Sequence, residues 1–196
     1  MITEIVFKSK NYVESIMKDN KKNGYYYHCW EHILEVYDRA KYLIEKEGIN
    51  DDLSEIIFIA IFFHDVAYQY DFKNHEELSS KMCEDFLLKN NYPKDRIDII
   101  KSIIIVTKPI IKPQNILEKI MKDSDLDNLG RKDFFEKGDL VKKELQNITG
   151  KKISDQDRNL TIYNLLCNTV FYTDTQRKER SQQLQKNILA IKKLLN

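Results

Sequence analysis

The sequence predicts an all-α protein, and two observations carry that prediction. Five glycines and three prolines among 196 residues are few for the many tight turns of a β-rich protein, since average usage of the two together is about 12%. Apolar residues also recur at spacings of three and four, the period of one helix face, most clearly in residues 31–47 and 184–195. The length fits one domain, so we expect a single compact helical domain.

Turn-forming residues divide the chain into eight or nine predicted helices. Gly48 follows one strong helical pattern and Asn50 offers a cap for the next. Two Lys-Pro pairs in residues 108–113 indicate a short non-helical link. The β-branched run 103–106 continues an apolar pattern from residue 97, which favours a buried helix over a strand. The predicted helices span residues 4–20, 26–47, 53–66, 76–90, 94–107, 114–122, 131–149, 157–172 and 175–195.

Composition excludes several classes of protein. A net charge of +1 argues against a dedicated nucleic-acid binder, which is normally basic on one face. The longest apolar run, residues 56–63, is far shorter than the ~18 residues that a membrane span needs. Three widely spaced cysteines without a C-x-x-C pair indicate reduced thiols. With no secretory signal pattern at the start of the sequence, we expect a cytoplasmic protein without a membrane partner.

The four histidines are the first candidates for chemistry, because histidine is the commonest metal ligand and proton-transfer residue. They are His28, His32, His64 and His75, all in the first 75 residues. His28 and His32 are four residues apart at the start of a predicted helix, which would place both rings on one face. Such a pair can bind one ion, or one ring can bind an ion while the other meets the substrate. A surface or capping pair is the structural alternative.

Asp65 follows a long apolar run and His64, so a carboxylate is expected at the end of a buried helix. Buried charges are generally paired or bound to metal; the alternative is that Asp65 ends the helix while His64 hydrogen-bonds a carbonyl group. Asp123, Asp125 and Asp127 follow a second apolar helix. They lack the glycine and glutamate of a calcium loop and could equally form a solvated helix end.

A mixed set of donors emerges when these segments are combined. His32, His64, Asp65 and Asp125 supply two nitrogens and two carboxylates, a set suited to Mn²⁺, Fe²⁺, Co²⁺, Ni²⁺ or Zn²⁺, with Mg²⁺ as a further candidate. We expect one ion, and leave a second ion open.

The order H…HD…D, carried by His32, His64-Asp65 and Asp125, resembles the HD superfamily of metal-dependent phosphohydrolases. The flanking residues resemble a bacterial branch of predicted HD phosphohydrolases. Departures are Cys29 in place of an Asn, His75 in place of another Asn, and Pro109 where a polar residue or His is frequent. The segments that carry the resemblance are Tyr27-His28-Cys29-Trp30-Glu31-His32, His64-Asp65-Val66-Ala67-Tyr68, His75-Glu76-Glu77-Leu78-Ser79 and Asp123-Ser124-Asp125-Leu126-Asp127-Asn128-Leu129-Gly130.

The resemblance implies one HD-type helical domain over residues 1–196, with a metal-site core at about 25–130 and C-terminal helices in 131–196. It implies a phosphohydrolase that cleaves an ester of a nucleotide or another small phosphorylated metabolite by metal-activated water. The expected ligands are the four residues of the donor set. The remaining expected roles are proton donation for His28, orientation or deprotonation of water for Asp65, binding of a second ion or orientation of the nucleophile for Glu76 and His75, and substrate contacts for Lys108, Tyr68 and His75.

Two other functions stay open at this point. A non-catalytic HD module could bind a ligand or partner, although it would have no reason to keep costly buried ligands. A di-iron oxygenase would need about six ligands, several of them histidine, and the chain has four histidines in all. The substrate, the choice between monoester and diester, the metal and the oligomeric state are not determined by the sequence.

Overall fold

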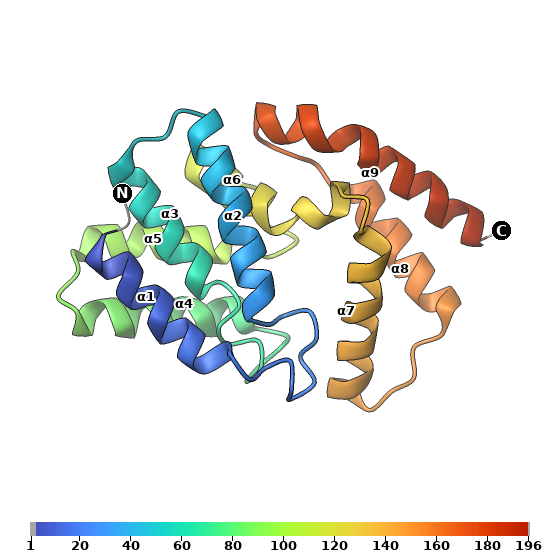
Figure 1. Ribbon diagram of the computed structural model, residues 1–196, viewed down its shortest axis with the longest axis horizontal. Helices are drawn as coiled ribbons and strands as arrows, with labels where there is room; N and C mark the ends of the chain where they lie inside the picture. The colour runs from blue at the N-terminus through green and yellow to red at the C-terminus, as the bar shows by residue number, and fades with distance from the viewer. Residues whose placement is uncertain (1–2, 196) are drawn as a thin grey trace.

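The computed structural model describes residues 3–195, which form nine α-helices and one short 3₁₀ helix, with no strand among them (Figure 1). The all-α prediction is therefore confirmed, including a helix rather than a strand at residues 103–105. The helices are α1 (Glu4–Met17), α2 (Trp30–Lys46), α3 (Asp51–Phe63), α4 (His75–Lys89), α5 (Lys94–Ile105), α6 (Ile116–Asp125), η1 (Asp127–Gly130), α7 (Phe134–Thr149), α8 (Asp155–Asn168) and α9 (Asp174–Leu195).

Helix α3 forms the centre of the larger of two apolar clusters. Every residue from Ile56 to Phe63 is buried, as expected for a helix that is hydrophobic on all sides. Helices α1, α2, α4, α5 and α6 all pack against it. Asn50 caps its N-terminus by accepting a hydrogen bond from the backbone N–H of Leu53. Because five helices pack around α3, its C-terminal end lies in the interior, and His64 and Asp65 follow it there.

A second, smaller apolar cluster joins η1 to α7, α8 and α9. These three helices lie together on one side of the α1–α6 group (Figure 1). Helix α9 packs along α8 and against η1, and α7 contacts η1. The buried members of this cluster are Leu129, Phe134, Leu166, Phe171, Leu184 and Ile191.

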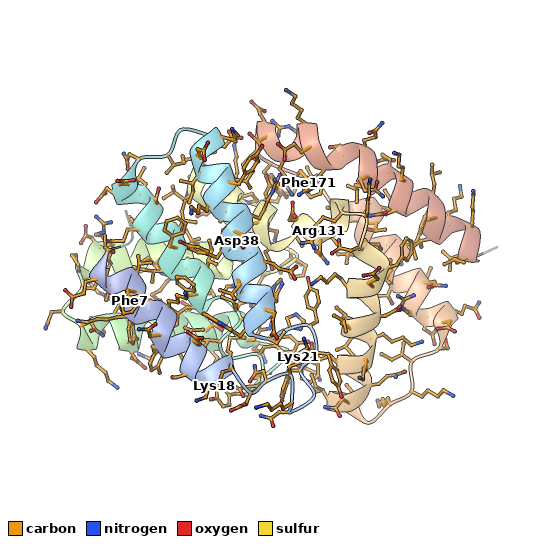
Figure 2. All side chains as sticks on the ribbon, viewed as in Figure 1. Phe7, Lys18, Lys21, Asp38, Arg131 and Phe171 are labelled. Atoms are coloured by element: carbon orange, nitrogen blue, oxygen red, sulfur yellow. The ribbon has the colours of Figure 1, made fainter. Side chains whose placement is uncertain are left out.

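Buried polar contacts connect the two groups of helices. Asp127 accepts hydrogen bonds from Arg180 (2.7 Å) and Gln176 (3.0 Å) on α9, and its Oδ1 lies 3.0 Å from Nε of Arg39 on α2. Arg131 bridges Glu35 on α2 and Asp133 at the start of α7, and Figure 2 shows Arg131 in the region between α2 and α7. These contacts join two apolar clusters that are otherwise separate. The single domain expected from the sequence remains a prediction.

None of the helices in residues 3–195 combines the length and apolar character needed to cross a bilayer.

Candidate metal centre

The ends of three helices place His32, His64 and Asp125 around one point. His32 lies in the first turn of α2, His64 directly follows α3, and Asp125 is the last residue of α6. One ligand atom from each side chain lies within 4.8 Å of the others, an arrangement that can hold a metal ion. Helix ends meet here because α2 and α6 both pack on α3. The sequence analysis predicted all three residues for a shared metal site.

Asp65, the fourth predicted ligand, lies against the same two rings. Its Oδ2 is 3.2 Å from His64 Nε2 and 3.5 Å from His32 Nε2. Asp125 approaches the two rings from its own side, with Oδ1 at 3.3 Å from His32 Nε2 and 3.5 Å from His64 Nε2. The two imidazoles therefore face two carboxylates, although Asp65 does not belong to the most compact group of three.

The orientation of His64 fits a metal ligand. Its Nδ1–H donates to the carbonyl oxygen of Ile61 at 2.7 Å, which leaves the Nε2 lone pair directed at the carboxylates. That Nε2 atom is buried and makes no hydrogen bond with the residues described. Outer hydrogen bonds of this kind fix the tautomer of metal-binding histidines. The sequence left open that His64 only hydrogen-bonds a carbonyl group. In the structure this hydrogen bond, to Ile61, uses Nδ1 and leaves Nε2 available as a ligand atom.

Electrostatics at the centre favours cationic charge between the carboxylates. Burial opposes the charged form of His64, but Asp65 and Asp125 raise its pKa well above the ordinary value. Burial works against ionisation of Asp65 as well, yet His64 and His75 hold the pKa of that carboxyl well below its usual range. The pKa of Asp125 is likewise lowered, against burial, by the neighbouring rings of His32 and His64. Two ionised carboxylates beside buried imidazoles provide the charge that a divalent cation balances.

His28 reaches the centre by a route that the sequence did not predict. Helix α2 begins at Trp30 rather than at residue 26, so the prediction that His28 and His32 share a helix face is wrong. The backbone of Cys29 is extended, which makes this residue the N-cap of α2 and leaves His28 before the helix. Ahead of it, Oε2 of Glu144 on α7 accepts the backbone N–H groups of Tyr27 (2.9 Å) and His28 (3.0 Å). The ring centroids of His28 and His32 are nevertheless 6.1 Å apart.

Glu144 also holds the ring of His28. Its Oε1 pairs with Nδ1 of His28, and its side chain is completely buried. Tyr68 stacks on the other side of the pair, with 3.6 Å between the ring centroids of Tyr68 and His28 and 11° between their planes. Burial, followed by the charge of Glu144, strongly raises the pKa of the Tyr68 hydroxyl. The ring of His28 is therefore fixed in position.

Glu144 was missed by the sequence analysis. It lies in a stretch rich in lysine and glutamate, which resembles a solvated helix face. A signal was present, because Glu144 follows Val141 by three residues and so falls on the apolar side of α7.

His75 and Glu76, at the start of α4, lie beside the centre. Nε2 of His75 is 3.3 Å from Oδ1 of Asp65, on the opposite oxygen from the one that faces His64. Nδ1 of His75 is 3.5 Å from Oε2 of Glu76, a buried oxygen with no hydrogen-bond partner among the described residues. Burial lowers the pKa of His75 but Asp65 more than offsets it, so the pKa is raised.

Lys108, predicted to contact substrate, has its ammonium group paired with Glu77. Among the described residues, no hydrogen bond or ion pair joins the side chain of Lys108 to the histidine–carboxylate group. Its role in binding substrate remains a prediction.

The three alternate aspartates have three different surroundings. Asp123 accepts hydrogen bonds from the backbone N–H groups of Tyr172 and Thr173, and Asp127 binds the arginines described above. Asp125 alone faces the histidines, which explains why the D-x-D-x-D pattern was weak evidence on its own.

Comparison with known proteins agrees with this geometry. The HD domain family model matches residues 29–127, about half of the sequence, and the chain belongs to this family, whose members are generally metal-dependent hydrolases. The match contains His32, His64, Asp65 and Asp125 and ends before α7.

Among solved structures, the Lin1889 protein from Listeria innocua is similar in fold. It is 23% identical, with a TM-score of 0.65, and the alignment covers 98% of this chain and 96% of that one. No curated protein sequence matches the chain.

Proposed function

We propose that the protein is a metal-dependent phosphohydrolase that cleaves the phosphate ester of a nucleotide or another small phosphorylated metabolite. The observation that carries the proposal is the convergence of His32, His64 and Asp125, with Asp65 against both rings. Membership of the HD domain family supports a metal-dependent hydrolase. The proposal adds to this a phosphate ester as the substrate.

A divalent ion held by these four residues would supply an activated water and would offset the negative charge of the phosphoryl group. The chain's own residues supply the rest. Asp65 has one oxygen toward the ligand histidines and the other toward His75. It is therefore placed to orient a water molecule and accept its proton, and Glu76 is placed to assist through His75.

His28 is the proposed proton donor for the leaving oxygen. The carboxylate of Glu144 at Nδ1 holds the ring so that Nε2 points away from Glu144. Tyr68 limits the ring to one plane by stacking on it. We retain Tyr68, His75 and Lys108 as proposed substrate contacts.

The alternative functions are less well supported by the geometry. A di-iron oxygenase requires about six ligands around two ions, whereas the compact group identified among residues 3–195 contains three. A non-catalytic module would not need a buried carboxylate on His28 in addition to the ligand set.

The experiment that tests the proposal joins metal analysis to a phosphatase screen over nucleotides and other phosphate monoesters and diesters, with Mn²⁺, Co²⁺ or Mg²⁺ supplied. The Asp65→Ala variant should lose bound metal and turnover and keep its helical circular dichroism spectrum. The matched control is Asp38→Ala, an exposed aspartate on α2 that is labelled in Figure 2. Normal metal content in Asp65→Ala would contradict the assignment, and iron with oxygen consumption would favour the oxygenase.

A further inference from the structure

A cavity of about 300 Å³ begins at the metal centre and extends between α7 and α8. Tyr27, His28 and Asp125 line the end nearest the histidines. A molecule bound in this cavity would therefore touch both a proposed metal ligand and the proposed proton donor. The volume is within the range of small-molecule sites, which begins at roughly 300 Å³.

The wall beyond the metal centre is mainly aliphatic. Asn128 and Thr161 are the uncharged polar side chains among the described residues of this wall. A nucleobase carries several donors and acceptors, and burying them without partners is costly. An alkyl or aryl group has no such requirement. The apolar side chains of the wall include Leu129, Phe134, Val141, Leu145, Ile162 and Leu165.

The two cationic side chains of the wall already have acidic partners. Nζ of Lys142 donates to Asp155 at 2.6 Å, and Nη2 of Arg158 donates to Asp139. Both aspartates are largely exposed, with side-chain exposures of 85% and 70%. The terminal groups of both side chains thus pair with acidic groups on the outer side, while Nε of Arg158 is buried without a hydrogen-bond partner among the described residues. The methylene groups of the lysine and arginine add to the apolar wall.

Gly138 contributes to the space between the helices. It lies inside α7 and lines the cavity, although glycine within a helix costs stability relative to alanine. A Cβ atom at this position would lie 3.3 Å from Nη2 of Arg158 and 3.6 Å from Cδ1 of Ile162. Both are the ends of flexible side chains, so a larger residue can be accommodated there only by extending into the cavity or displacing them.

From this cavity we infer the substrate class: the enzyme acts on a phosphate ester of an apolar alcohol or phenol, and the apolar group occupies the space between α7 and α8. The inference rests on the proposed function and makes it more specific. Most of the wall comes from residues 128–165, beyond the segment 29–127 that matches the family. The metal ligands thus lie within the segment that matches the family, and the proposed binding site for the organic group is formed mainly by residues that follow it.

Binding of alkylphosphonates to the Mn²⁺-loaded protein tests the inference without requiring turnover. Methyl-, ethyl-, butyl- and hexylphosphonate share one head group and differ in apolar length. Each buried methylene contributes about 0.8 kcal/mol, which is about a fourfold change in Kd. We therefore expect Kd, measured by calorimetry, to fall on the order of 10²-fold from ethyl to hexyl. Equal affinity along the series would overturn the inference.

Two variants that fill the cavity locate the effect. Gly138→Leu and Val141→Phe both add volume from α7, and should remove most of the gain with chain length while leaving Kd for methylphosphonate within about twofold. Glu136→Leu, on the exposed face of α7, is the matched control and should behave as the original protein. A chain-length dependence that survives both fillings would place the apolar group elsewhere and refute the assignment.

Turnover separates this inference from the proposed function. If hexyl phosphate exceeds ethyl phosphate and AMP in kcat/KM by about 10²-fold, both hold. If AMP is the better substrate, the inference fails and the proposed function stands. If no ester is cleaved but hexylphosphonate binds with the expected dependence on Gly138 and Val141, the proposed function fails and the apolar binding site stands.

Discussion

Replacing Glu144 by glutamine tests the proposed role of His28 most directly. Glu144 accepts two backbone N–H groups through one oxygen and faces Nδ1 of His28 with the other. Glutamine has nearly the same shape but only one acceptor oxygen. If that oxygen keeps the two backbone contacts, the amide NH₂ group faces Nδ1 and can no longer accept its proton.

The magnitude follows from the bond that is lost. A hydrogen bond to a charged partner contributes roughly 1.5–3 kcal/mol, and here it positions the ring that is proposed to deliver the proton. Each 1.36 kcal/mol corresponds to a tenfold change in rate. The Glu144→Gln variant should therefore show kcat lowered by about 10- to 150-fold at neutral pH, with its metal content unchanged because Glu144 is not a ligand.

The assay compares two leaving groups in the same variant. An alkyl phosphate releases a poor leaving group that requires a proton, whereas p-nitrophenyl phosphate releases a stable anion that leaves without one. For the alkyl ester we expect the whole 10- to 150-fold decrease in kcat, roughly, that corresponds to the lost interaction of ~1.5–3 kcal/mol. For the nitrophenyl ester we expect a decrease of less than about threefold, because its leaving group does not need the proton. His28→Ala should show the same selectivity, and Glu136→Gln on the same helix should show no loss.

Equal losses for both esters would refute the reasoning, because they would indicate a general displacement of the centre. An unchanged rate on the alkyl ester in Glu144→Gln would remove His28 from the proposed acid role. Additive losses in the double variant of Glu144 and His28 would also count against a shared function, since residues acting as one unit are strongly non-additive.

Three further predictions concern stability. Chelation should lower the melting temperature of the metal-loaded protein by removing about 2.7 kcal/mol of stabilisation at 100 times Kd, and Asp125→Asn should abolish this response in a thermal scan. Lys122→Met should lower the free energy of unfolding in urea by about 1–3 kcal/mol, because the buried ammonium group of Lys122 donates to carbonyl oxygens of the segment 106–111. Lys119→Met is the control, and an equal decrease in that variant would contradict the role of Lys122. Hydrogen bonds from two lysines lower the pKa of Glu84 from 4.5 to about 2. Its ionised form therefore stabilises the fold above about pH 4.5, and that contribution is lost as the pH falls toward 2. The stability difference between Glu84→Gln and the original protein should disappear over that range, and a constant difference would contradict the assignment.

The helices were predictable because their signals are local. Apolar periodicity and turn residues gave nine helices, and the predicted bounds differ from the observed ones by at most four residues at each end. Two bounds differ by four residues, the end of α8 and the start of α2. Just before α2, residues 27 and 28 bind the carboxylate of Glu144, which is more than a hundred residues away in sequence. A local pattern carries no record of such a contact.

The positions of the ligand residues were predictable for a related reason. A carboxylate directly after an apolar helix must find a partner, and His64, Asp65 and Asp125 all stand at helix ends. What the sequence did not predict was the contribution of α7. Glu144 and Gly138 have ordinary neighbours in sequence, and their importance arises only from how α7 is placed against residues 27–28 and α8.

The proposed metal ligands and most of the cavity wall lie on different helices, so the two can change separately. The groups proposed to grip the ion come from α2, α3 and α6, whereas the hollow beside them is shaped by α7 and α8. A new preference for the organic partner would therefore need replacements mainly on two outer helices that carry none of the proposed ligands. Helices α7 and α8 could therefore be redesigned for another organic group while the proposed metal ligands stay unchanged. Such a redesign must keep the hydrogen bonds from residues 27 and 28 to Glu144.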